Sequence, residues 1–265
     1  MLRPNGLAEA LTVLSENPQA MPLAGGTDLM VEVNFGYIRP EAVLTLRRVP
    51  ELAESTQNRI GAGVTFRDLE LSPHRALAQL ARTIGSPQIR AAGTIGGNVA
   101  TASPAGDSLP FLAALDAKIE VASTTEVRSV PWDQFFVGVK RTSKREDELI
   151  TAVVLPDDMP AQQEFAKIGQ RSAMVISMVC ACVLRWGEGR VRVALGSVGP
   201  TPVRARRAEE MISAETDPSE AALDEFAHLV SEEVRPITDH RGTEDYRRHA
   251  SGVLARRLLE RCLAA

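Results

Sequence analysis

The chain has 265 residues, with 30 Lys or Arg against 34 Asp or Glu and a formal net charge of −4. That balance provides no positive surface on which to wrap nucleic acid or to hold an anionic membrane. With 44% hydrophobic and 24% charged residues, the composition is that of a globular protein, and the length suits one large domain or two modest ones.

The N-terminal part of the chain combines short helical and extended patterns. Apolar residues at three- and four-residue spacing predict helices over 7–17, 27–33 and 77–84. Short apolar runs predict strands over 21–24, 43–46 and 60–64. Two glycine clusters interrupt these elements, at Gly25-Gly26 and at 93–98, and both are predicted as turns.

The C-terminal part begins with extended patterns and ends with helical ones. Strands are predicted over 118–122, 127–130, 149–155, 164–168, 179–186 and 191–198. Helices are predicted over 205–214, 219–234 and 244–263. The polar segment 157–160 marks a candidate domain boundary. Because strands and helices follow no regular βαβ rhythm, the sequence predicts an α+β fold in which a three-stranded sheet is backed by the C-terminal helices.

The first glycine cluster has the sequence Leu23-Ala24-Gly25-Gly26-Thr27-Asp28. Adjacent glycines permit positive φ and let backbone N–H groups approach a ligand closely. A helix that starts at Thr27 would add unpaired N–H groups, which favour an anion such as phosphate. A plain strand-to-helix turn explains the same residues, so the pair alone is a weak signal.

The second cluster, Thr94-Ile95-Gly96-Gly97-Asn98, is followed by a turn that ends at Asp107, a residue able to accept hydrogen bonds from ribose hydroxyls. A structural turn is again the simpler alternative. Neither cluster has the spacing of the Rossmann or P-loop motifs. Two such turns, about 70 residues apart, suit a diphosphate held between two subdomains.

Seven longer segments extend this pattern over nearly the whole chain. They are AGGTDL at 24–29, TIGGNVATASPAGDSLP at 94–110, FFVGVKRT at 135–142, DELI at 147–150, FAKIGQRSAMVIS at 165–177, LGSVGPTPVRARRAE at 195–209 and ITDHRGTEDYRR at 237–248. With these segments the chain resembles the FAD-binding medium subunits of the molybdenum hydroxylase family, which includes xanthine dehydrogenase and carbon monoxide dehydrogenase. The resemblance implies a two-part FAD-binding domain of the vanillyl-alcohol-oxidase (PCMH) type over 1–160, with subdomains at about 1–55 and 56–160, then a small C-terminal α+β domain over 161–265.

The resemblance also implies which residues bind FAD. Those expected around the diphosphate in the first segment are Leu23, Ala24, Gly25, Gly26, Thr27, Asp28 and Leu29. Those expected to form the second wall of the site are Thr94, Gly96, Gly97, Asn98, Thr101 and Ala102. Asp107 is expected near the ribose or adenosine, and Leu149 and Ile150 are expected to close on the cofactor. Lys167 would approach the isoalloxazine, where a cation can stabilise negative charge on reduced flavin. Ile84 stands where xanthine-type members can place an aromatic ring, so ring stacking is not expected there.

Partners are implied because the chain is too short to hold a molybdopterin domain as well. By the family resemblance, a large molybdopterin subunit and a small subunit with two [2Fe–2S] clusters would complete a heterotrimer, and two heterotrimers would form a dimer. NAD⁺, oxygen or a quinone would accept the electrons. Xanthine or another N-heterocycle is the preferred substrate, with carbon monoxide and aldehydes as alternatives. Two rival hypotheses are a self-sufficient flavin oxidase and a scaffold that has lost its cofactor.

The remaining candidate residues favour structural roles. Cys180, Cys182 and Cys262 are too few for a disulfide framework or a four-cysteine cluster, and Cys180 and Cys182 alternate on one strand face, which suits packing. The four histidines lie far apart, and the basic run at 140–145 is expected to be a solvated face or a subunit contact. No metal site is expected. No apolar run reaches membrane-spanning length and no secretory signal is evident, so we expect a cytoplasmic protein.

Overall fold

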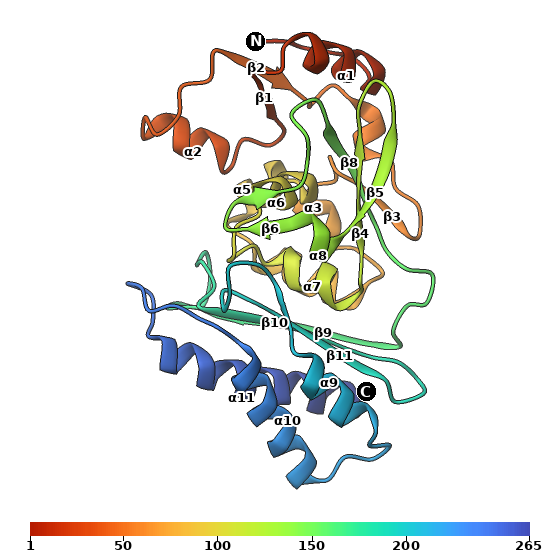
Figure 1. Cartoon of the computed structure of the whole chain (residues 1–265), viewed down its shortest axis with the longest axis vertical. Coiled ribbons are helices and arrows are strands. Elements are labelled where there is room, and N and C mark those ends of the chain that lie inside the picture. The colour runs from red at the N-terminus through yellow and green to blue at the C-terminus, as the bar shows by residue number, and fades with distance from the viewer.

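The computed structural model describes residues 1–265, which run from an N-terminal lobe at the top of Figure 1, through a central lobe, to a sheet and helices at the bottom. The N-terminal lobe contains α1 (Leu7–Glu16) and a parallel pair of strands, β1 (Ala20–Leu23) and β2 (Ala42–Thr45). Between these strands the chain makes an outward excursion that contains α2 (Leu29–Asn34). No residue of α2 is buried, so this helix contributes little to the core.

The central lobe is built around an antiparallel sheet with the strand order β3-β8-β4-β5. These strands are β3 (Arg59–Gly61), β4 (Lys118–Ala122), β5 (Val127–Pro131) and β8 (Leu149–Val154). The short helices of the lobe are η1 (Pro50–Ala53), α3 (Phe66–Leu69), α4 (Arg75–Thr83), α5 (Pro87–Ala92), α6 (Ile95–Thr101), α7 (Ser108–Ala114) and α8 (Trp132–Phe135). A two-stranded hairpin, β6 (Phe136–Gly138) and β7 (Arg141–Thr142), lies beside them.

The C-terminal domain is an antiparallel sheet with three helices on one face. Its strands are β9 (Gln162–Ile168), β10 (Val179–Arg185), β11 (Val191–Gly196) and β12 (Val203–Arg204), in the order β12-β11-β10-β9. The helices are α9 (Arg206–Ser213), α10 (Glu220–Glu233) and α11 (Glu244–Leu263). The predicted three strands are therefore present, and the two-residue β12 adds a fourth at the edge that is too short to leave a periodic signal.

Both faces of the C-terminal sheet are buried. The side chains of Cys180, Cys182 and Leu184 belong to the core shared with the central lobe, whereas Val179, Ala181 and Val183 belong to the core under the helices. Alternate residues of a strand point to opposite faces, so β10 separates the two cores. The predicted packing role of the two cysteines is confirmed. None of the helices has both the length and the apolarity needed to cross a bilayer.

Two predicted boundaries differ in a way that matters for the site. The second helix begins at Leu29, with Asp28 as its N-cap, and not at Thr27. The second glycine cluster is not a turn, because Thr94 caps a helix whose first residues are Ile95, Gly96 and Gly97. Glycine disfavours helix interiors by about 1 kcal/mol, which is why the sequence pattern indicates a turn there.

Candidate functional site

The two glycine clusters lie against each other. A Cβ atom on Gly25 would lie only 1.8 Å from the carbonyl oxygen of Ala92, and a Cβ on Gly93 would lie 3.2 Å from the Thr27 hydroxyl oxygen. The Thr101 hydroxyl donates a hydrogen bond of 3.2 Å to the Asp28 carboxylate. Segments about 70 residues apart therefore meet, and at Gly25 only a residue without a side chain permits the approach.

The first cluster presents unpaired backbone donors. None of the N–H groups of residues 24–28 donates a hydrogen bond within the chain, and Gly26 has φ of +72°. Buried or half-buried N–H groups normally find an acceptor, and successive N–H groups around a glycine with positive φ form an anion-binding concavity. This segment therefore suits a diphosphate, as its sequence predicts.

The second cluster has already used its backbone donors. The N–H groups of Ile95 and Gly96 bind the carbonyl oxygens of Val64 and Ala62, and that of Gly97 binds the Thr94 hydroxyl at 3.0 Å. A Cβ on Gly96 would lie 2.5 Å from the Cβ of Ala62, so packing alone explains that glycine. Gly97 is different, because a Cβ there would meet only the Thr94 hydroxyl oxygen, at 3.2 Å. This helix thus offers an open glycine surface and side chains in place of free N–H groups.

Asp107 and Lys167 form a buried ion pair. The Lys167 Nζ lies 2.6 Å from Asp107 Oδ2 and also donates to the carbonyl oxygen of Val175 at 3.1 Å. Ser177 donates its hydroxyl proton to the other carboxylate oxygen of Asp107. The two side chains are 9% and 7% exposed, so the pair joins the loop between α6 and α7 to the C-terminal sheet. Nothing in the local sequence near Asp107 identifies Lys167 or Ser177 as its partner.

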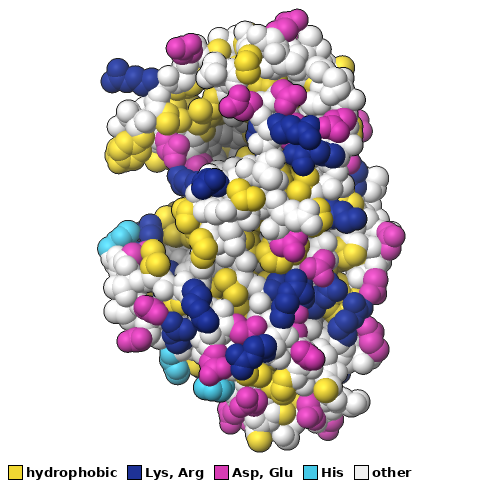
Figure 2. All heavy atoms as spheres, in the orientation of Figure 1, with side chains coloured by type: hydrophobic (Ala, Val, Ile, Leu, Met, Phe, Trp, Pro, Cys, Tyr) yellow, Lys and Arg dark blue, Asp and Glu magenta, His cyan; other side chains and the backbone are white.

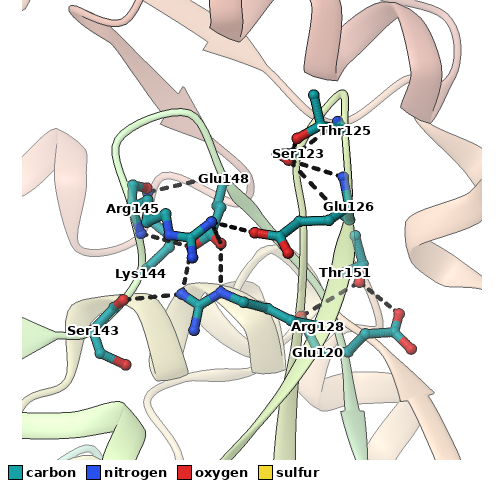
Figure 3. Close-up of polar contacts among 10 residues, drawn as sticks. All are labelled: Glu120, Ser123, Thr125, Glu126, Arg128, Ser143, Lys144, Arg145, Glu148 and Thr151. Atoms are coloured by element: carbon teal, nitrogen blue, oxygen red, sulfur yellow. Dashed lines mark hydrogen bonds and ion pairs between the residues drawn. The ribbon is translucent and has the colours of Figure 1, made fainter.

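Leu149 and Ile150 begin the buried strand β8, opposite Ala122 and Val121 of β4. The polar cluster in Figure 3 fixes this start. Glu148, which immediately precedes Leu149, accepts two hydrogen bonds from the Arg128 guanidinium, at 2.6 and 2.8 Å. Burial alone would raise the pKa of Glu148, but Arg128 and the N–H of Arg145 outweigh it and lower that pKa below its usual value.

The charge of Glu148 is expected to stabilise the chain measurably. Glu148→Gln removes the ion pair with Arg128 and should lower the free energy of unfolding at pH 7 by about 2 kcal/mol. Because the pKa is lowered on folding, this contribution is complete above the ordinary value of 4.5 and is lost as the pH falls through the folded-state value. In urea unfolding, the difference in free energy of unfolding between the wild type and Glu148→Gln should therefore be smaller at acidic pH than at pH 7. Glu146→Gln, at an exposed neighbour without an ion-pair partner, is the control, and equal effects of the two variants would contradict the assignment.

Both lysines of the predicted basic run have acceptors within the chain. Lys140 Nζ lies 2.5 Å from Glu32 Oε1 of α2, and Lys144 donates to the carbonyl oxygen of Glu148. Burial lowers the pKa of Lys144. The Lys140 pair connects the outlying α2 to the central lobe, and Figure 2 shows a hollow in the surface between these two parts. Lys140 and Arg145 are half-exposed, in agreement with a solvated face, whereas Lys144 is partly buried and departs from that expectation.

The other expected site residues occupy the borders of the same region. Leu23 ends β1 and Leu29 begins α2. Ala102 ends α6 in the left-handed conformation, with φ of +46°. Asn98 accepts a hydrogen bond from the Ser108 hydroxyl at 2.6 Å. Ile84 lies at the end of α4 and packs on the core of the central lobe.

Family models and relatives agree with this geometry. The FAD binding domain in molybdopterin dehydrogenase matches residues 1–158, and the CO dehydrogenase flavoprotein C-terminal domain matches residues 164–262. The chain belongs to this family. It is thus an FAD-binding medium subunit of the xanthine dehydrogenase and carbon monoxide dehydrogenase type, as its motifs predict.

Individual relatives of this flavoprotein cover most or nearly all of it. A xanthine dehydrogenase FAD-binding subunit of Escherichia coli O157:H7 is 31% identical over 98% of the chain and 94% of the relative. A nicotinate dehydrogenase FAD-subunit of Eubacterium barkeri is 33% identical over 79% of the chain and 77% of the relative. The carbon monoxide dehydrogenase structure from Hydrogenophaga pseudoflava superposes with a TM-score of 0.91, at 28% identity, over 99% of the chain and 96% of its own.

The residues of this flavoprotein fit FAD in two respects. The free N–H groups of residues 24–28 match the charge of a diphosphate. At Gly97, the open backbone surface of α6 admits a close planar or ribose group, which a side chain there would exclude. The first glycine segment therefore suits an anion, and the second suits contact without backbone donors.

Proposed function

We propose that this flavoprotein is the electron-transfer subunit of a molybdenum-containing hydroxylase or dehydrogenase. In that complex a large partner holds molybdopterin and oxidises the substrate, and a small partner with [2Fe–2S] clusters delivers electrons to this chain. When bound, FAD supplies a centre that takes up electrons singly and releases them as a hydride. The chain's own residues bind the cofactor, orient it and exclude water from it.

The observation that carries this proposal is the junction of the two glycine segments. In the proposed complex, residues 23–29 surround the diphosphate, and the free N–H groups of residues 24–28 bind it. Gly97, Asn98 and Thr101 form the facing wall, and the Asp107–Lys167 pair borders the ribose and the isoalloxazine. Leu149 and Ile150 support the cofactor from β8. Ile84 stands where xanthine-type members can place an aromatic ring, so no side chain stacks on the cofactor from that position.

The chain's donor atoms assign the iron–sulfur clusters to a partner. All three cysteines are buried and free, and no group of three His, Cys, Asp or Glu side chains is arranged to hold a metal. We further propose a cytoplasmic dimer of heterotrimers. The FAD-binding domain would end near residue 160, with its own division near residue 55.

Xanthine is the substrate we propose for the complex, with NAD⁺ as the electron acceptor. Near-full-length similarity to a xanthine dehydrogenase FAD-binding subunit supports this choice. Relatives named for nicotinate and carbon monoxide have comparable identity. The substrate pocket would lie on the large partner, so the choice is tested on the complex.

The complex purified with its partners should contain flavin, molybdenum and iron. Under anaerobic conditions, xanthine is expected to bleach the visible flavin absorption of the complex but not that of the isolated chain, because the electrons must come through the partners. NAD⁺ should then restore the absorption. Bleaching of the isolated chain by xanthine would instead identify a self-sufficient oxidase, and a complex without flavin would refute the proposal. Nicotinate, an aldehyde and carbon monoxide serve as the alternative substrates.

A further inference from the structure

The loop between α6 and α7, residues 102–107, is held by the C-terminal domain. The N–H of Ser197 donates to the carbonyl oxygen of Pro104 at 2.7 Å. The hydroxyl of Ser177 and the ammonium of Lys167 bind the two carboxylate oxygens of Asp107. Every one of these donors lies outside the FAD-binding domain, so the shape of this loop depends on the position of the sheet below it.

The sheet packs closely against α7 and touches this loop. A Cβ on Gly196 would lie 2.7 Å from Cys180 Sγ of the neighbouring strand, 3.0 Å from Pro110 Cγ of α7 and 3.5 Å from the carbonyl oxygen of Pro104. The next residue, Ser197, has φ of +65°, a conformation that costs a non-glycine residue about 1 kcal/mol or more and persists only where its surroundings impose it. Something must therefore hold Ser197 in the orientation that directs its N–H at Pro104.

Arg247 of α11 holds it. This side chain is 4% exposed, and its Nη1 donates to the carbonyl oxygens of Ser197 and Met178, at 2.9 and 2.8 Å. Its Nη2 donates to Asp239 Oδ1 at 2.7 Å. Burial would raise the pKa of Asp239, but the N–H of Arg241 and the Arg247 guanidinium outweigh it and lower that pKa to about 2. Asp239 is therefore ionised at neutral pH and forms an ion pair with Arg247.

The two carbonyl groups that Arg247 binds belong to the two chain segments that contact Pro104 and Asp107 of the loop. Ser197 binds Pro104 directly, and Met178 immediately follows Ser177, which binds Asp107. A single guanidinium thus fixes two of the three segments of the C-terminal domain that support the loop, and β9, which supplies Lys167, is the third. A planar group with several donors suits this task, since one nitrogen can bridge two carbonyl oxygens while another binds a carboxylate.

We propose that Arg247 is a positioning residue for FAD binding, which acts through Ser197 and Ser177 to hold the loop 102–107 in its binding conformation. This inference rests on the proposed function, since it requires that the chain bind FAD beside Asp107. Arg247 itself does not contact the cofactor. Its loss should weaken FAD binding by more than its effect on stability explains.

Arg248 provides a matched control on the same helix. It too donates to two carbonyl oxygens, those of Ser231 and Val234, and to one carboxylate, that of Glu244. These partners lie at the end of α10 and at the start of α11, and none of them binds Ser177, Ser197 or the loop 102–107 directly. Arg247→Gln and Arg248→Gln therefore remove similar sets of hydrogen bonds, and only the first set includes a direct bond to Ser197, whose N–H binds the loop.

The test measures stability and FAD affinity separately on the full chain. Arg247→Gln is expected to bind FAD about tenfold more weakly or worse in a flavin fluorescence titration, the scale of loss when an outer supporting partner is removed. Arg248→Gln should keep the wild-type affinity despite a lower melting temperature. Arg247→Lys, which retains the charge but not the planar fork, should give an intermediate affinity. Amide hydrogen exchange at residues 102–107 should accelerate in Arg247→Gln alone.

Several outcomes would overturn the inference. An unchanged FAD affinity in Arg247→Gln would do so, as would equal losses of affinity in the Arg247 and Arg248 variants. If Arg247→Gln does not fold, Ser177→Ala removes only one hydrogen bond of the same route and must weaken FAD binding. If the wild-type chain binds no FAD alone or with its partners, the proposed function fails, but hydrogen exchange at 102–107 still reports whether Arg247 positions the loop.

Discussion

Gly25→Ala is expected to remove FAD binding and to destabilise the fold. The new Cβ would lie 1.8 Å from the carbonyl oxygen of Ala92 and 3.0 Å from the N of Gly93. Both atoms belong to the backbone, so no rotamer change relieves the overlap, and the first glycine segment must move away from α5. We expect a loss of about 2–3 kcal/mol in the free energy of unfolding, at the upper end for overpacking, and no detectable FAD affinity.

Gly97→Ala separates binding from stability at the same junction. Its Cβ would meet only the Thr94 hydroxyl oxygen, at 3.2 Å, within a helix. Alanine favours a helix over glycine by about 1 kcal/mol, so stability should change by no more than that amount. FAD affinity should nevertheless fall, because the methyl group would occupy the surface on which the cofactor is expected to lie.

The two variants are checked by urea unfolding and by flavin fluorescence titration. Gly187→Ala is the control, since a Cβ there would meet nothing within 4 Å, and it should alter neither quantity. Wild-type FAD affinity in Gly97→Ala would exclude Gly97 from the binding surface. Wild-type stability in Gly25→Ala would show that the first glycine segment adapts more freely than its contacts suggest.

The sequence predicts the fold best where one face of an element is exposed. The helices at 7–17, 219–234 and 244–263 and the strands of the C-terminal sheet agree with the structure, because polar and apolar positions alternate or recur there. Every residue of α7 is buried, so this helix has no polar face and no periodic signal. The short elements α3, α5 and α8 have too few turns to reveal a period.

The site is predictable only as far as its signals are local. The glycine pair at 25–26 and the Asp107 turn are visible as motifs, and the family resemblance connects them. That Gly96 serves packing against Ala62 depends on a contact with another element. Similarly, the partner of Asp107 is 60 residues away, on β9. Such contacts are decided by the packing of whole lobes, which single-sequence patterns do not encode.

Lys167→Ala is expected to destabilise the chain more than any exposed lysine substitution. It leaves the buried carboxylate of Asp107 with only the Ser177 hydroxyl as a side-chain partner. Breaking one half of a buried ion pair costs about 3–5 kcal/mol, because the remaining charge is uncompensated. Lys140→Ala removes a lysine that is 51% exposed in its pair with Glu32, and exposed pairs contribute about 1 kcal/mol or less. Urea unfolding of both variants at pH 7 measures the difference.

The double variant Asp107→Asn/Lys167→Met distinguishes a structural pair from a cofactor contact. With both charges removed, no buried ion remains unpaired, so most of the lost stability should return. FAD affinity should stay low, because the proposed contacts of Asp107 with the ribose side and of Lys167 with the isoalloxazine are both gone. Recovery of stability without recovery of binding would show that the pair serves the cofactor as well as the domain junction. Full recovery of both would mean that the pair only joins the domains, and that the charge expected beside the isoalloxazine comes from elsewhere.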